Sequence, residues 1–181
     1  MKQLDNIFMP DEASLDPAIA SFLGCTKDAW KAYEQAMLAK RHQEIAAMAC
    51  QQGVPAHIRR DVELSRNLLL YSFFVYEFAT AAAHYAAIAL EAALRRALGK
   101  NEACRDNLDT LLREAVAAGM LSSADHEYVT APHFVSESRN GLAHAKEDRD
   151  VFNYALALPF VEMTIRAINA LFPDDLSAQS S

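Results

Sequence analysis

Apolar residues recur every three or four positions along most of this chain, which is the spacing of one face of an α-helix. The first long example begins at Thr26 and runs to about Gln51, where Gly53 and Pro55 end it. Its apolar face is expected to comprise Trp30, Tyr33, Met37, Ile45 and Met48. A shorter helix over roughly 14–22 is expected before it, within an otherwise loose lead-in.

Residues 57–98 contain neither glycine nor proline and are predicted to be helical throughout. One unbroken helix of that length would span about 60 Å, so we expect a kink or two consecutive helices. The part from Leu68 to Leu90 is almost entirely apolar, but Glu77 and His84 interrupt it, which argues against a membrane span. A helix that is apolar on all sides instead forms the buried centre of a bundle, or a core helix that also serves a subunit interface.

Glycine and asparagine residues mark the next expected helix ends. Gly99 is expected to end the long apolar segment, with Arg95 and Arg96 favourably placed in its last turn. Asn107 is expected to cap a helix over 108–118, because its side chain can accept a bond from a free amide of the first turn. Gly119 is expected to end that helix.

Two prolines organise the remainder of the chain. Pro132 separates a short helix from a second one over about 133–140. The last helix is predicted over about 151–172, and Pro159 should kink it or mark its start.

These elements predict an all-α protein: a four- to five-helix up-and-down bundle with an added N-terminal helical extension. We assign the extension to 1–60, packed on the core, the bundle to 61–175, and a disordered tail to 176–181. A chain of 181 residues suits one domain, and 52% hydrophobic with 23% charged residues is typical of a globular protein. Only 5 Gly and 6 Pro occur, which disfavours sheets and glycine-rich nucleotide loops.

The net charge and the cysteines indicate which ligands and which cellular compartment to expect. The net charge of −7 argues against a broad nucleic-acid surface but leaves room for a small basic site. Cys25, Cys50 and Cys104 are isolated and odd in number, so we expect free thiols in a reducing compartment. The first residues lack the apolar run of a signal peptide, which makes the cytoplasm the expected location.

Glu77, His84 and Glu91 recur every seven residues and would share one stripe of a helix. Di-iron bundles use Glu-x-x-His pairs and many zinc enzymes use His-Glu-x-x-His, and neither pattern occurs here. We therefore expect a stripe of satisfied polar groups, with no metal and no cofactor.

The segment 138–144, Ser-Arg-Asn-Gly-Leu-Ala-His, combines a helix stop with reactive side chains. Arg139 carries a permanent charge that can fork two hydrogen bonds onto a phosphate, and His144 titrates near neutral pH. This pairing suits phosphodiester chemistry without a metal. The same residues could also be structural: Arg139 could pair with a carboxylate such as Glu91, Asn140 could only cap a helix, and His144 could only bond a carbonyl.

The order of features from the apolar helix ending at 89–96, through the amphipathic helix over 108–121, to the segment 139–144 resembles the HEPN family of all-helical domains. The motif of that family is an Arg followed after four to six residues by a His, commonly with a polar residue after the Arg. Here the gap is four and the polar residue is Asn140. The resemblance covers roughly residues 65–172.

The Ser-Arg-Asn sequence also occurs at 65–67, but no His follows within six residues. We assign it no role beyond a surface patch near a helix start.

The resemblance implies a homodimer in which two motifs face each other across one cleft. Arg139 would hold the scissile phosphate, His144 would act as general base or acid, and Asn140 would orient the phosphate or His144. Glu91 matches an acidic supporting position that would hold Arg139 or His144. RNA would be the substrate, because the internal nucleophile is the 2′-hydroxyl.

The cations expected to widen the basic patch for substrate binding are Arg95, Arg96 and Lys146. The function implied is a metal-independent endoribonuclease of toxin or defence type, accompanied by an antitoxin or other partner protein. The alternative from a different class is a non-catalytic dimeric HEPN-like scaffold, or a nucleotide- or ligand-binding module. In both readings the protein has no membrane partner.

Overall fold

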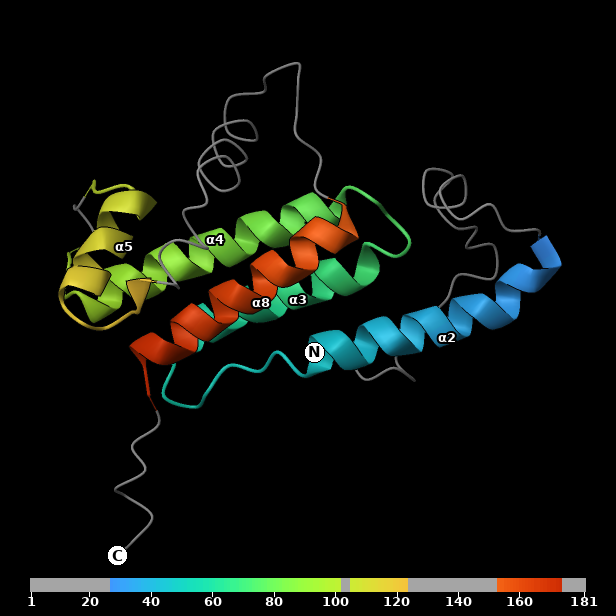
Figure 1. Cartoon of the computed structure of the whole chain (residues 1–181), viewed down its shortest axis with the longest axis horizontal. Helices are drawn as coiled ribbons and strands as arrows, with labels where there is room; N and C mark the ends of the chain where they lie inside the picture. Colours follow the sequence, from blue (N-terminus) through green and yellow to red (C-terminus); the bar gives the residue numbers. More distant parts are fainter. Residues whose placement is uncertain (1–26, 102–104, 124–152, 174–181) are drawn as a thin grey trace, which may run out of the picture.

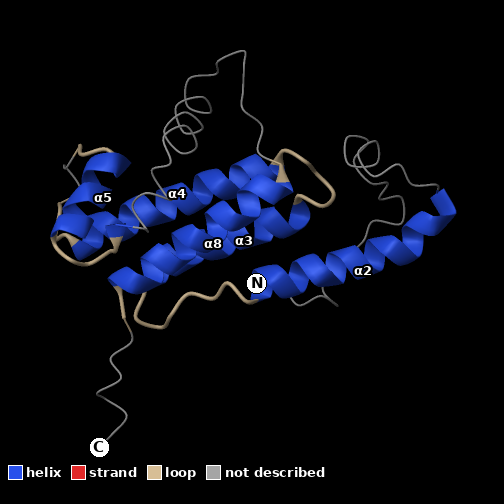
Figure 2. Cartoon of the chain, in the orientation of Figure 1, coloured by secondary structure: helices blue, strands red, loops and turns tan. Residues whose placement is uncertain are grey.

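The computed structural model describes residues 27–101, 105–123 and 153–173, and these are built from helices without a strand (Figures 1 and 2). The helices are α2 (Lys27–Ala46), α3 (Ala56–Tyr71), α4 (Phe78–Ala97), α5 (Leu108–Ala117) and α8 (Tyr154–Leu171). The predicted all-α bundle is confirmed. The short helices expected over 14–22 and 133–140 lie outside the described residues.

Helix α4 is the centre of the packing. It contacts α3, α8 and α5, while α2 contacts α3. Its buried residues are mostly alanine: Ala79, Ala82, Ala83, Ala86, Ala87, Ala89 and Ala93. Such small side chains let neighbouring backbones approach closely, and the Ser65 hydroxyl of α3 donates a hydrogen bond to the backbone carbonyl of Ala82 at 2.7 Å.

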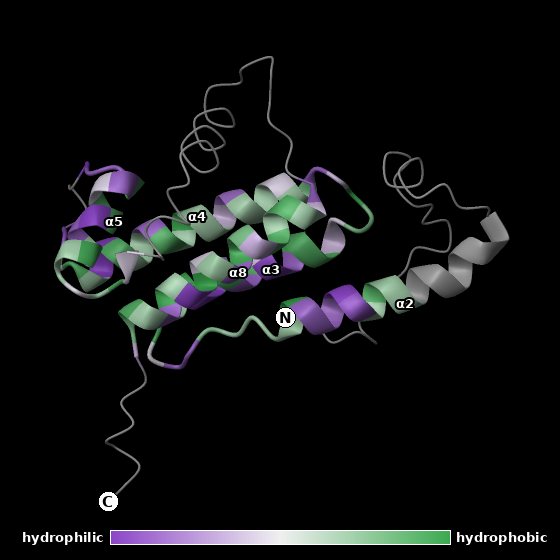
Figure 3. Cartoon of the chain, viewed as in Figure 1, coloured by the Kyte–Doolittle hydropathy of each residue, from purple (hydrophilic) through white to green (hydrophobic). Residues whose placement is uncertain are grey.

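The long segment predicted over 57–98 divides into α3 and α4, as expected for two consecutive helices. The break follows Tyr71, where the Ser72 amide donates to the Leu68 carbonyl and the Ser72 hydroxyl donates to the Leu69 carbonyl at 2.7 Å. Apolar residues are distributed around α4 and α8 (Figure 3). Nevertheless, none of the helices in the described part of the chain is long and apolar enough to cross a membrane.

Local capping chemistry ends the helices near the predicted points. The Asn107 side chain accepts a hydrogen bond from the Thr110 amide at 2.8 Å, as expected for an N-cap. Gly99 and Gly119 follow α4 and α5 with φ of +65° and +71°, a left-handed conformation that favours glycine. Asn153, which the sequence reading did not single out, caps α8 through the Leu156 amide at 3.0 Å. Pro159 lies inside α8 and does not mark its start.

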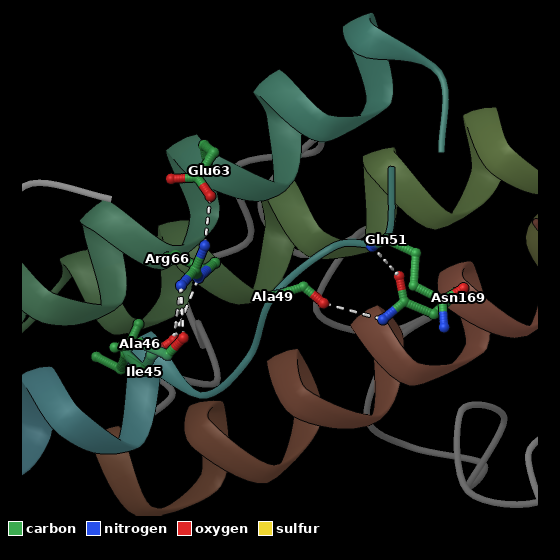
Figure 4. Close-up of polar contacts among 7 residues, drawn as sticks. All are labelled: Ile45, Ala46, Ala49, Gln51, Glu63, Arg66 and Asn169. Atoms are coloured by element: carbon green, nitrogen blue, oxygen red, sulfur yellow. Dashed lines mark hydrogen bonds and ion pairs between the residues drawn. The ribbon is translucent and has the colours of Figure 1, made fainter. Parts of the chain in front are cut away.

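Arg66 is buried in α3, so the expectation that residues 65–67 form a surface patch is wrong (Figure 4). Its guanidinium donates to the Ile45 carbonyl at 3.2 and 3.0 Å and to the Ala46 carbonyl at 3.2 Å. It also pairs with Glu63. The last carbonyls of a helix have no intrahelical partner, so Arg66 satisfies the end of α2. This helix ends at Ala46, earlier than the predicted Gln51.

Asn169 of α8 holds the chain that follows α2 (Figure 4). Its side-chain nitrogen donates to the backbone carbonyl of Ala49 at 3.0 Å. Its side-chain oxygen accepts a hydrogen bond from the backbone N–H of Gln51, also at 3.0 Å. The α2–α3 connection is therefore fixed at both sides, by Arg66 from α3 and by Asn169 from α8. Helix α3 already begins at Ala56, within the segment assigned to the N-terminal extension.

Arg41 of α2 is also buried, but unlike Arg66 it packs against aromatic rings. Its guanidinium carbon lies 3.8 Å from the Tyr154 ring centroid and 5.1 Å from that of Phe73. Its Nε and Nη1 are buried without a hydrogen-bond partner in the described structure. Burial lowers the pKa of Arg41 and raises that of Tyr154, whose hydroxyl donates to Glu44 at 3.1 Å.

The two arginines predict opposite responses to replacement by methionine. Arg66→Met leaves helix-end carbonyls and Glu63 without their partner and should lower the free energy of unfolding by about 3 kcal/mol. Arg41→Met removes desolvated, unsatisfied donors together with a cation–π contact, so its net effect should stay within about 1 kcal/mol. Urea unfolding followed by circular dichroism measures both.

Arg60→Met, on the exposed side of α3, is the matched control and should be nearly neutral. Equal losses for Arg66→Met and Arg41→Met would contradict the assignment of Arg66 as the residue that holds α2.

Candidate functional site

The structure describes three of the predicted site residues, and all three lie near the C-terminal end of α4. These are Glu91, Arg95 and Arg96. The motif residues Arg139, Asn140 and His144, and the predicted substrate-binding Lys146, lie outside the described residues. The described part of the candidate site is therefore the helix expected to support the motif.

Glu91 and Arg95 form an ion pair one helical turn apart. The distance from Arg95 Nη2 to Glu91 Oε1 is 2.9 Å, and the two side chains are 23% and 15% exposed respectively. Arg95 Nη2 also donates to the Asp106 carbonyl at 2.9 Å, so this arginine joins α4 to the chain before α5. The carboxylate of Glu91 is thus partly buried and oriented, whereas its expected contact with Arg139 or His144 remains a prediction.

Lys100 extends this charged region beyond the end of α4. Its Nζ lies 2.7 Å from Glu114 Oε2 and 3.1 Å from Asp106 Oδ2. Hydrogen bonds from Lys100 to Glu114 and Asp106 raise the pKa of Lys100 to about 12. The sequence reading missed this residue, because its two acceptors become neighbours only when α5 packs on α4.

Two of the described cations at this end of the molecule are therefore paired with carboxylates. Arg95 faces Glu91, and Lys100 faces Asp106 and Glu114. Arg96 is exposed, and among the described residues it has no recorded ion pair. Of the cations predicted to contact substrate, Arg96 is the one on the described surface that is open to a ligand.

The stripe of Glu77, His84 and Glu91 does not converge on a metal site. Glu77 is exposed and precedes α4, and His84 is half-buried with its ring 6.3 Å from that of Tyr85, edge to face. Within 27–101, 105–123 and 153–173, no group of three or more His, Cys, Asp or Glu side chains is arranged to hold a metal ion.

Cys50 is a free thiol, as expected from its isolation in the sequence. Burial raises the pKa of this thiol, which disfavours the reactive thiolate form. Its position between α2 and α3 makes it a packing residue and not a candidate nucleophile.

Comparison with known proteins gives no match to a family model, to a curated protein or to a solved structure. The functional argument therefore rests on the residues of this chain.

The Lys100 cluster predicts a specific dependence of stability on pH. A folded-state pKa raised from 10.5 to about 12 stabilises the fold below pH 10.5, and this contribution is lost as the pH rises through about 12. The difference in Tm between wild type and Lys100→Met should therefore be constant up to pH 10.5 and then vanish. The difference is small because the pairs are exposed and screened.

Arg113→Met serves as the control for this titration. Arg113 pairs with Asp109 at 2.6 Å, and an arginine in general stays charged where a lysine titrates. Its difference in Tm should not change between pH 10.5 and 12. A Lys100→Met difference that behaves in the same way would contradict the raised pKa.

Proposed function

We propose that this chain is a HEPN-like, metal-independent endoribonuclease of toxin or defence type, in which Arg139, Asn140 and His144 of two copies act in one cleft. The observation that carries the proposal is the order of elements: a core helix with an oriented Glu91 in its C-terminal half, the capped helix α5, the Arg-x4-His motif, and then α8. This is the order found in the family that the sequence resembles.

The proposed reaction follows from the chemistry of the motif residues. His144 removes the proton from a ribose 2′-hydroxyl, and the resulting oxygen attacks the adjacent phosphorus. The bond from phosphorus to the 5′-oxygen breaks, and that oxygen takes up a proton from the protonated His144 of the second copy. Arg139 holds the phosphate oxygens as their charge develops, and Asn140 orients the phosphate or the imidazole.

Charge balance limits how the protein would hold RNA. A net charge of −7 and the paired cations near α5 leave few positive groups for phosphate. Arg96 and Lys146 are the cations proposed to extend the site beyond Arg139. A site with so few phosphate contacts should bind RNA weakly and with a shallow dependence on salt.

Replacing either reactive residue tests the proposal. Arg139→Ala and His144→Ala should each reduce cleavage of a mixed RNA substrate by at least about 100-fold. The loss should be the same in EDTA and in magnesium, because the scheme uses no metal. Gel analysis of RNA incubated with each purified protein measures the rate.

His57→Ala and Arg60→Ala are matched controls, since both residues are exposed on α3. They should cleave at the wild-type rate. Equal cleavage by all five proteins would assign the activity to another source and remove the proposal.

The exposed face of α4 favours one alternative, a non-catalytic dimeric scaffold or ligand-binding module. Phe78, Tyr85 and Ile88 are 36–38% exposed and follow one another at helical spacing. Large apolar side chains that are exposed together on one helix suit contact with another helix. A dimer by light scattering that leaves RNA intact would select this alternative. A neutralising partner protein belongs to the nuclease hypothesis only, whereas the proposed cytoplasmic location applies to both functions.

A further inference from the structure

A cavity of about 360 Å³ lies between the end of α2 and one face of α8. This volume falls within the range of small-molecule sites. The α8 side of the cavity consists of residues at helical spacing, Leu158, Glu162, Ile165 and Asn169, with Arg166 beside them. The opposite side comes from the last turn of α2 and the chain that follows it, including Met48.

Much of the described lining of this cavity is apolar. Met48, Leu158 and Ile165 supply the apolar surface, and Met48 and Ile165 are largely buried. Asn169 also lines the cavity, and its two polar side-chain atoms bond the backbone of Ala49 and Gln51 (Figure 4). This asparagine therefore lines the cavity while it holds the chain that follows α2.

Two opposite charges border the cavity one helical turn apart. Glu162 and Arg166 are both exposed, and they do not form an ion pair with each other, although their spacing on the helix permits one. In the described structure Glu162 has no recorded polar partner, and Arg166 Nη1 approaches only the sulfur of Met163, at 3.9 Å.

The third charged residue at the cavity is already engaged. Glu44 accepts a hydrogen bond from the Tyr154 hydroxyl at 3.1 Å and lies 3.9 Å from Lys40 Nζ. The groups left for a ligand are thus one carboxylate and one guanidinium, carried by residues whose Cβ atoms are about 6 Å apart on α8.

We propose that this cavity binds a free α-amino acid with an apolar side chain. The ammonium group contacts Glu162, the carboxylate accepts two hydrogen bonds from Arg166, and the side chain packs on Met48, Leu158 and Ile165. A zwitterion is the ligand that matches both charges at once. A simple amine would leave Arg166 facing a like charge, and a phosphate or fatty acid would face Glu162 and Glu44.

This inference does not depend on the nuclease proposal, because the described lining residues on which it rests are not part of the 139–144 motif. The binding experiment can therefore be repeated with His144→Ala and should give the same result. Failure of RNA cleavage and failure of amino-acid binding are separate outcomes.

Isothermal titration with L-leucine tests the proposal. We expect saturable binding with a Kd near or below about 1 mM. Isopentylamine, which lacks the carboxylate, and 4-methylpentanoate, which lacks the ammonium group, should each bind at least about tenfold more weakly. Glu162→Gln and Arg166→Gln should each weaken the binding of L-leucine by a similar factor. Both changes are at exposed positions, where the fold tolerates substitution.

Arg60→Gln, an exposed change on α3, is the control and should bind like wild type. The proposal is overturned if L-leucine gives no saturable signal up to about 10 mM. It is also overturned if the two truncated analogues bind as well as L-leucine, or if both variants at the cavity bind like wild type.

Discussion

The close contact between α4 and its neighbours is the constraint on which the rest of the structure depends. α4 packs against both α3 and α8, and it does so with alanine at most of its buried positions. The 2.7 Å hydrogen bond from the Ser65 hydroxyl to the Ala82 carbonyl requires the backbones of α3 and α4 to lie close together. A larger residue at Ala82 or Ala86 would force the helices apart, because cores tolerate little added volume.

The same helix connects the core to the candidate site. The buried part of α4 fixes the position of its last turns, where Glu91 and Arg95 pair and Lys100 reaches Asp106 and Glu114. These polar contacts hold α5 at the end of α4, and α5 is the last described element before the motif segment. A rigid acidic residue on a core helix is well suited to position a reactive arginine or histidine.

Helix ends that are set by interactions between neighbouring residues could be predicted from the sequence. Contacts between residues far apart in the chain could not. Asn107, Gly99 and Gly119 act through their own backbone neighbours, so the sequence indicates these helix ends directly. Arg66 was misjudged because its partners are carbonyls of α2, some twenty residues earlier in the chain. The pairing of Lys100 and the cavity beside Glu162 likewise arise only when helices pack. Of the candidate site, the motif could be proposed from its spacing, and its geometry stays a prediction.

The most direct measurement of the central claim is the chemical identity of the RNA ends after cleavage in EDTA. Attack by the 2′-hydroxyl leaves a 2′,3′-cyclic phosphate on one fragment and a 5′-hydroxyl on the other. Mass spectrometry of the fragments should find these ends, and a substrate with 2′-deoxyribose at the cleavage site should stay intact. Fragments that carry 3′-hydroxyl and 5′-phosphate ends, or RNA that remains whole, would contradict the account.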